Sequence, residues 1–242
     1  MNQVAVVGVG YWGRNLVRTF GGLPGAVLTW VCDTDVDALD RVKTAHPSVR
    51  ICTSYDRLLD QKDVQAVVLA TPAPTHHALA RKALEAGKDV FVEKPLCLSV
   101  DDAADLVLLA RERKRVLMVG HLMVHHPAVR WIEQRLGAGD LGDPYYLYFQ
   151  RLNLGIVRQD ENAWWSLAPH DVSIALLLLG REPRTVSARG ACYLRAGVEE
   201  LVLGWARDHG APLPTERIRE LLAVDVELNA QGLEAWLDRD RR

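Results

Sequence analysis

The run Val4-Ala5-Val6-Val7-Gly8-Val9-Gly10-Tyr11-Trp12-Gly13 stands near the start of the chain. Four apolar residues followed by G-x-G-x-x-G predict a buried strand that turns directly into a helix. The first glycine permits the tight turn, the second leaves space for a pyrophosphate, and the third lets helix and strand pack closely. Because a helix N-terminus favours negative charge, this stretch predicts a dinucleotide site. The alternative is a sharp turn without a ligand.

An acidic residue stands where a ribose partner is expected. Asp33 follows an apolar run at 27–32 and lies 20 residues beyond Gly13 (33 − 13). A carboxylate there accepts two hydrogen bonds from an adenosine ribose diol. The 2′-phosphate of NADP would be repelled by about 4 kcal/mol at a separation of about 4 Å. Thr34 and Asp35 supply no compensating Arg. The predicted cofactor is therefore NAD, with NADP less favoured.

The first 120 residues alternate short apolar runs with helix-period stretches. We predict strands at 4–7, 27–32, 50–52, 66–70, 90–92 and 116–119, and helices at 15–20, 36–45, 76–86 and 100–113. The runs are near-continuous Val, Ile, Leu and Ala, which is typical of parallel strands buried on both faces. Ser99 with Asp102 predicts a helix start, and Gly87 a helix end. Residues 1–120 are expected to form an α/β Rossmann domain with a doubly wound parallel sheet.

The pattern changes after Gly120. A helix at 128–136, a long aromatic-rich strand at 145–154, a helix at 170–179 and a strand at 185–194 are predicted. Long strands after a completed βαβ series indicate a smaller α+β domain, here residues 121–204. The charged stretch 205–242 has helical patterns at 216–228 and 233–238, so we expect a helical tail.

Composition excludes several classes of protein. The chain has 242 residues, 49% of them hydrophobic, with a formal net charge of −2. That balance gives no electrostatic reason to expect nucleic acid or an anionic membrane as a partner. The longest strongly apolar run, at 174–179, is far shorter than the roughly 20 residues that span a bilayer, and the N-terminus lacks a basic targeting segment. Four scattered cysteines favour a reducing compartment. We expect a cytoplasmic protein with a small-molecule partner.

Two further motifs resemble the signature of the Gfo/Idh/MocA oxidoreductases. They are Thr71-Pro72-Ala73-Pro74-Thr75-His76 and the tripeptide Glu93-Lys94-Pro95. In that family both motifs form turns near the nicotinamide, at the carboxyl edge of the sheet. The resemblance covers about residues 1–200. It implies an NAD-dependent oxidoreductase whose second domain carries the substrate pocket, with a homo-oligomer as the candidate assembly. The implied cofactor-binding residues are Gly8, Gly10, Tyr11, Trp12, Gly13, Asp33, Thr71, Pro72, His76, Glu93 and Lys94.

The second half carries a narrower resemblance. Residues 164–171, Trp-Trp-Ser-Leu-Ala-Pro-His-Asp, resemble the start of the family's catalytic helix. Residues 151–155, Arg-Leu-Asn-Leu-Gly, resemble a sugar-nucleotide subgroup, the UDP-N-acetylglucosaminuronate 3-dehydrogenases. The implied substrate-binding residues are Arg151, Asn153, Trp165 and Asp171. Arg151 and Arg158 suit a diphosphate, although exposed surface arginines and a packed tryptophan pair are the simpler alternatives.

The chain also departs from the family. Many members carry Asp-x-x-x-His at the catalytic helix, whereas this chain has Ser166 in the Asp position. Members commonly run well beyond 300 residues, with a large open sheet for substrate binding and dimerisation. Here the resemblance ends near Glu200, and Gly204–Arg207 onward has a helical pattern where return strands are expected. We therefore expect a second domain that is shortened or fused.

Oxidation of a secondary alcohol needs a base for the hydroxyl proton. The pKa of Lys94 would have to fall by roughly 3 units from about 10.4 to serve at pH 7, whereas His170 starts near 6.5. We predict His170 as general acid/base and Lys94 as the charged donor to the reacting oxygen. The alternatives are a Lys94 that merely extends to solvent and a His170 that caps its helix, with Asp171 in the first turn.

A metal site is not expected. His121, His125 and His126 tempt such an interpretation, but no Glu follows His121 and Pro127 breaks any helix there. The predicted function is oxidation of a secondary hydroxyl of a sugar or sugar nucleotide by hydride transfer to NAD, with a UDP-sugar uronate favoured. Two alternatives stay open. One is a catalytically impaired dinucleotide-binding remnant, and the other is a dehydrogenase for a free polyol or inositol.

Overall fold

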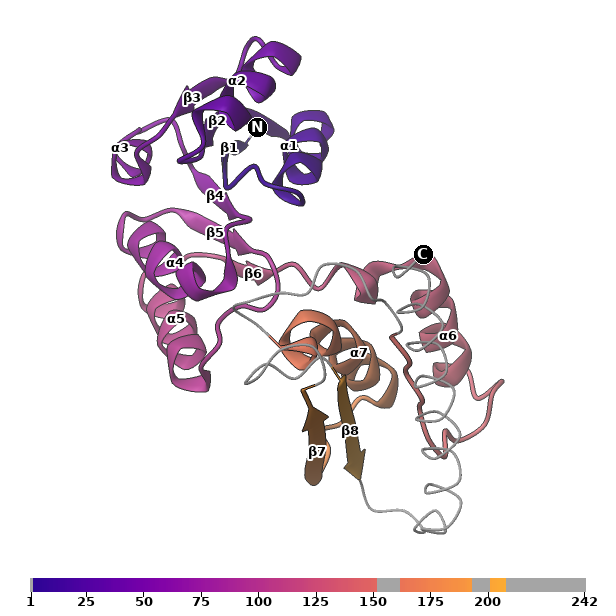
Figure 1. Cartoon of the computed structure of the whole chain (residues 1–242). Helices are drawn as coiled ribbons and strands as arrows, with labels where there is room; N and C mark the ends of the chain where they lie inside the picture. Colours follow the sequence, from indigo (N-terminus) through magenta and orange to yellow (C-terminus); the bar gives the residue numbers. More distant parts are fainter. Residues whose placement is uncertain (1, 152–161, 193–200, 208–242) are drawn as a thin grey trace, which may run out of the picture. The chain divides into compact units, whose positions relative to one another are not determined.

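The computed structural model describes residues 2–151 and 162–192, together with the backbone of residues 201–207. A six-stranded parallel sheet forms the N-terminal half (Figure 1). Its strand order is β3-β2-β1-β4-β5-β6. The strands are β1 (Asn2–Val7), β2 (Ala26–Cys32), β3 (Arg50–Cys52), β4 (Ala66–Leu69), β5 (Asp89–Val92) and β6 (Leu117–Val119). The order reverses between β1 and β4, and ligands of open α/β sheets bind at the carboxyl edge of such a switch point.

The helices of this half confirm the predicted alternation. They are α1 (Gly13–Gly22), α2 (Val36–Ala45), α3 (Tyr55–Leu59), α4 (His76–Glu85) and α5 (Val100–Glu112), with a short 3-10 helix η1 (Ala73–Thr75). The predicted strands and helices agree with the observed ones to within two residues at each end. The two short helices α3 and η1 were missed, because five and three residues are too few to show a helical period. The Rossmann prediction is confirmed.

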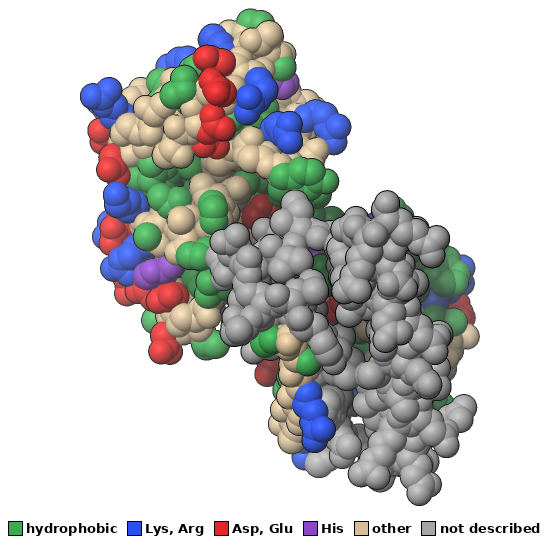
Figure 2. Space-filling model, in the orientation of Figure 1, with side chains coloured by type: hydrophobic (Ala, Val, Ile, Leu, Met, Phe, Trp, Pro, Cys, Tyr) green, Lys and Arg blue, Asp and Glu red, His purple; other side chains and the backbone are tan. Residues whose placement is uncertain are grey.

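Two apolar clusters pack on opposite faces of the sheet. Along β1, Ala5 and Val7 belong to one cluster, while Val4 and Val6 belong to the other. The first cluster includes residues of α3, α4 and α5, and the second includes residues of α1 and α2. Burial on both faces is the reason why these strands are continuously apolar. Acidic and basic side chains are intermixed over the visible surface of this half (Figure 2).

The boundary signals have their predicted partners. The Ser99 hydroxyl accepts a hydrogen bond from the Asp102 backbone N–H, so Ser99 caps α5. Gly87 follows the end of α4 with φ +71°, a conformation that favours glycine. Asp35 caps α2 in the same way as Ser99, through the Ala38 N–H. The caps at Ser99 and Asp35 thus fix helix starts at the carboxyl edge of the sheet, and Gly87 fixes a helix end at the opposite edge, before β5.

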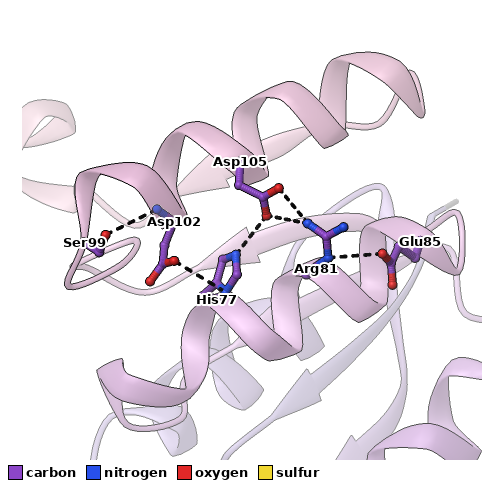
Figure 3. A network of polar contacts seen from close by, with 6 residues as sticks. All are labelled: His77, Arg81, Glu85, Ser99, Asp102 and Asp105. Carbon is purple, nitrogen blue, oxygen red and sulfur yellow. Dashed lines mark hydrogen bonds and ion pairs between the residues drawn. The ribbon is translucent and has the colours of Figure 1, made fainter.

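A polar network joins α4 to α5 on the surface (Figure 3). Asp105 of α5 accepts hydrogen bonds from His77 Nε2 at 2.9 Å and from Arg81 Nη1 at 2.6 Å. Arg81 also pairs with Glu85, and Asp102 lies 4.0 Å from His77 Nδ1. The guanidinium and imidazole donors hold the pKa of Asp105 below its usual value. This network supports the helix that follows the Thr71–His76 motif.

The second half contains the elements η2 (Leu122–His125), α6 (Pro127–Gly137), α7 (Ala163–Leu179), β7 (Thr185–Ala191) and β8 (Leu201–Arg207). Strands β7 and β8 form a two-stranded sheet. The helix expected at 128–136 and the first seven residues of the strand expected at 185–194 are therefore confirmed. Predictions for 152–161, 193–200 and 208–242 fall outside the described residues, and these include Asn153, Arg158 and both helical patterns of the tail.

Three expectations for this half are wrong. Residues 145–151 form no strand, because an alternating aromatic pattern gives a strand only when a neighbour pairs with it. Helix α7 begins at Ala163, seven residues before His170 (170 − 163), since Asn162 caps it through the Trp165 N–H. His170 is therefore no cap, and Asp171 is not in a first turn. Gly204–Arg207 are strand, not helix.

Candidate functional site

The glycine-rich turn has the shape that its sequence predicts. A Cβ on Gly13 would lie 1.9 Å from the carbonyl oxygen of Gly8, so only glycine allows this close approach of helix and strand. Gly8 has φ +86°, and its Cβ would lie 2.8 Å from the backbone of Ala70. Gly10 differs, because a Cβ there meets nothing within 4 Å. Gly8 and Gly13 thus serve the fold, while Gly10 faces open space.

Asp33 closes this turn from the end of β2. Its Oδ2 accepts a hydrogen bond from the Val9 N–H at 2.5 Å, and Oδ1 accepts one from the Asp35 N–H at 2.9 Å. A carboxylate has about four acceptor positions, so two remain for a ribose diol. The Val9 bond was not anticipated from the sequence. This bond joins Asp33, the candidate ribose-binding residue, to the glycine-rich turn, the candidate pyrophosphate site.

A cavity of about 360 Å³ lies beside this turn. Its lining includes Gly10, Tyr11 and Asp33, together with two arginines, Arg14 and Arg41, which sequence reasoning missed. Arg41 Nη2 lies 3.8 Å from Asp35. Only the two residues after Asp33 were considered as charge partners from the sequence, whereas the first turn of α1 and the second turn of α2 bring cations into the same cavity. The position of Arg14 directly after Gly13 was the available signal.

His76 holds the two family-like turns together. Its ring is 1% exposed, with Nδ1 2.7 Å from the carbonyl oxygen of Pro95 and Nε2 2.8 Å from that of Thr71. Thr75 donates a hydrogen bond to the Thr71 hydroxyl, or receives one from it, at 2.8 Å, and Pro72 precedes η1. The motif at 71–76 therefore fixes the turn after β5, and the His76 side chain acts through Pro95.

Glu93 links that turn to the glycine-rich turn. Its Oε1 accepts a hydrogen bond from the Trp12 indole N–H at 2.7 Å, and its Oε2 accepts one from the Lys94 N–H at 3.3 Å. Burial raises the pKa of Glu93, although the Trp12 and Lys94 bonds oppose this. A Cβ on Gly120 would lie 3.1 Å from both carboxylate oxygens. The small residue after β6 thus lets the buried carboxylate fit.

Lys94 reaches α7. Its Nζ donates a hydrogen bond to the carbonyl oxygen of Ser166 at 2.7 Å. His170 lies one helical turn further along α7 (166 + 4), on the same side of the helix. The ammonium of Lys94 contributes to lowering the pKa of His170, which also places the two groups near each other. The structure thus brings the two predicted catalytic residues together, from strand-end and helix positions 76 residues apart (170 − 94).

The electrostatics of His170 differ from the expectation. Burial, followed by the charges of Lys94, Arg151 and His121, lowers the pKa of His170 to about 4, against a smaller raising effect of Asp171. The ordinary pKa near 6.5, from which the assignment of His170 as the base started, is therefore not kept in the fold. Burial and Lys94 also lower the pKa of His121. Sequence reasoning weighed His121 only as a metal ligand and missed that it lies beside His170.

The predicted substrate-binding residues are partly paired with each other. Arg151 donates to Asp171 through Nη2 at 2.7 Å and through Nε at 3.0 Å. Trp165 lies in the first turn of α7, where its backbone N–H contacts the cap Asn162. His126, one of the three histidines considered for a metal, instead caps α6 through Ala128. Within the described ranges, no group of three or more His, Cys, Asp or Glu lies close enough to hold a metal ion.

Together, the sheet and its glycine-rich turn define a dinucleotide-binding domain of the Rossmann type. A family model described as an oxidoreductase family with an NAD-binding Rossmann fold, GFO_IDH_MocA, matches residues 2–121. Through this domain the chain belongs to the Gfo/Idh/MocA oxidoreductase family. In the part of the chain that the structure describes, no helix is long and apolar enough to cross a membrane.

Two curated relatives illustrate the range of the family. UDP-N-acetylglucosamine 3-dehydrogenase of Acidithiobacillus ferrooxidans is 35% identical over 189 residues, which are 78% of this chain and 58% of that protein. The NAD(+)-dependent scyllo-inositol 2-dehydrogenase of Bacillus subtilis is 31% identical over 197 residues, or 78% and 57%. The chain thus spans just over half the length of these relatives.

A solved structure agrees with the fold. GenD2 from gentamicin A biosynthesis, in complex with NAD, superposes with a TM-score of 0.73 at 27% identity. The match covers 84% of this chain and 61% of that one. It therefore extends past the Rossmann domain into the second half.

Proposed function

We propose that this protein is an NAD-dependent dehydrogenase that oxidises a secondary hydroxyl of a sugar nucleotide, with a UDP-sugar or its uronate as the favoured substrate. The observation that carries the proposal is the convergence of Lys94 and His170. Both lie at the carboxyl edge of the sheet, where the Trp12–Glu93 bond joins their turn to the glycine-rich turn. The activity is proposed for a chain that covers 58% of its UDP-N-acetylglucosamine 3-dehydrogenase relative.

The residues present fit a dinucleotide. Gly10 leaves open space where a side chain would intrude. Asp33 retains acceptor positions for the ribose, and the N-terminus of α1 suits the pyrophosphate. Bound NAD⁺ supplies the hydride acceptor. The preference for NAD rests on the Asp33 carboxylate, although Arg14 and Arg41 line the same cavity, so a direct comparison of NAD⁺ with NADP⁺ belongs to the test.

The site can manage the hydroxyl proton with its own side chains. The Lys94 ammonium donates to the reacting oxygen and stabilises the negative charge that develops there. His170 is neutral at pH 7, because its pKa is about 4, so it is ready to accept the proton. A base with so low a pKa is weak, and the transfer therefore depends on Lys94 stabilising the alkoxide.

The choice of substrate class rests on the relatives. The UDP-N-acetylglucosamine 3-dehydrogenase relative supports a sugar nucleotide, and Arg151 beside Asp171 offers a guanidinium suited to a diphosphate. The scyllo-inositol 2-dehydrogenase relative supports a free cyclitol as the second candidate. Self-association belongs to the proposal as well, since Tyr145, Tyr146 and Tyr148 are all exposed. The mass of the protein in solution tests this part.

The test is NAD⁺ reduction by the full chain across UDP-sugars, their uronates, free sugars and inositols. Wild-type protein is compared with Lys94→Met, His170→Asn and the control His125→Asn, whose side chain is exposed on η2. Reduction with one UDP-sugar, lowered about 100-fold or more in both site variants and unchanged in the control, supports the proposal. Equal turnover in Lys94→Met contradicts it. NAD⁺ binding without turnover of any substrate supports the alternative, a catalytically impaired dinucleotide-binding remnant.

A further inference from the structure

The imidazole of His121 lies near Lys94, in addition to the imidazole of His170. His121 follows β6, whose end lies beside that of β5 because the Gly120 N–H donates to the carbonyl oxygen of Val92 at 2.8 Å. The next element, η2, packs against α7, which carries His170. Lys94, His121 and His170 thus reach one place from three different parts of the chain.

One nitrogen of each ring lacks a hydrogen-bond partner. Nδ1 of His121 and Nδ1 of His170 are buried without a hydrogen bond. The other histidines near the sheet differ: His76 lies between two carbonyl oxygens, and His77 contacts two carboxylates (Figure 3). Buried polar atoms in proteins are nearly always hydrogen-bonded, so two orphaned ring nitrogens beside the candidate catalytic lysine indicate a place that a ligand fills.

The charges around the two rings select the chemistry of that ligand. Burial and Lys94 keep both imidazoles neutral at pH 7, because they lower the pKa of each. A neutral imidazole offers one N–H donor and one acceptor nitrogen. The nearby carboxylates are engaged elsewhere, Asp171 with Arg151 and Glu93 with Trp12. A hydroxyl group can therefore satisfy either ring, whichever ring nitrogen carries the proton, because a hydroxyl both donates and accepts.

We propose that His121 contacts the substrate and holds the hydroxyl on the carbon next to the reacting one, so that the site selects a vicinal diol. The inference rests on the proposed function. Lys94 and His170 serve the reacting oxygen, which leaves His121 for a second oxygen. On a sugar or cyclitol ring, a neighbouring hydroxyl supplies that oxygen at short range.

The test is a thermodynamic cycle that combines a change of one side chain, His121, with the removal of one hydroxyl from the sugar. With the full chain and NAD⁺, calorimetry measures binding of UDP-N-acetylglucosamine and of its analogue without the 4-hydroxyl, the hydroxyl next to position 3. His121→Asn is compared with wild type and with the control His125→Asn. We expect His121→Asn to weaken binding of the parent sugar about 5- to 10-fold, as for one hydrogen bond. The same change should alter binding of the deoxy analogue less than twofold.

Each outcome decides a different point. Equal affinity of wild type and His121→Asn for the parent sugar overturns the inference, and so does an equal loss for both ligands, since that marks a structural role. NAD⁺ binding without binding of either sugar overturns this inference together with the sugar-nucleotide class. Absence of NAD⁺ binding overturns the proposed function itself. Should the variant fail to fold, ring ¹⁵N resonances of wild-type His121 must shift when the parent sugar is added, and unshifted resonances overturn the inference.

Discussion

Among single residues, Glu93 is a buried carboxylate whose hydrogen bonds hold the turn after β5 against the glycine-rich turn. Burial raises its pKa, so the stabilising effect of the protonated form is full below the ordinary pKa and is lost as the pH rises through the folded value. We expect Glu93→Gln, which keeps an acceptor for Trp12, to be at least as stable as wild type at pH 7. Glu93→Ala, which loses that bond, should be less stable by about 1 kcal/mol. Urea unfolding at pH 7 and pH 4 checks this. A Gln variant that is less stable than wild type at pH 7 contradicts it.

His170 makes stability depend on pH in the opposite direction to Glu93. Its folded pKa of about 4 lies below the ordinary value of 6.5, so the neutral ring is favoured in the fold. The associated stability is full above pH 6.5 and is lost as the pH falls towards 4. Wild type should therefore lose more stability than His170→Asn over this range, as measured by urea unfolding at pH 7, 5.5 and 4.5. A difference between the two proteins that does not change with pH rules this out.

Contacts between residues far apart in sequence were the hardest to foresee. Gly8, Gly13, Asp33, Lys94 and His170 were assigned from local motifs, and the structure places them at one edge of the sheet. The Trp12–Glu93 bond joins positions 81 residues apart, and no local pattern signals it. His121 was missed for the same reason, because its neighbours arrive from β5 and α7.

At the scale of elements, the α4–α5 network of Figure 3 should contribute to stability through Asp105. Hydrogen bonds from Arg81 and His77 lower the pKa of Asp105, so this stability is present above the ordinary pKa and is lost as the pH falls through the folded value. We expect Asp105→Asn to lower Tm at pH 7, by less at high salt, because the groups are exposed. Asp102→Asn is the control, since its side chain lies 4.0 Å from His77 and the change keeps the backbone N–H that donates to Ser99. Equal effects of the two changes contradict the assignment.

How accurately each element was predicted depends on which interactions stabilise it. The strands of the Rossmann half were located well because burial on both faces gives each a continuous apolar run, visible without its neighbours. Residues 145–151 carry an equally clear aromatic pattern but form no strand, since pairing depends on a partner that the pattern cannot name. The start of α7 was misplaced because Pro169 suggested an entry, whereas the Asn162 cap fixes the helix seven residues earlier.

For the whole molecule, cofactor binding should appear as added stability that depends on Gly10. A ligand that binds only the folded chain stabilises it by about 2.7 kcal/mol at 100 times its Kd. Gly10→Val puts a side chain into open space, so it should leave the stability of the free protein nearly unchanged while removing this gain. Gly22→Val is the matched control, because a Cβ there also meets nothing within 4 Å, and it lies at the far end of α1. Thermal unfolding with and without NAD⁺ makes the comparison, and a Gly10→Val protein that NAD⁺ stabilises as much as wild type would place the cofactor elsewhere.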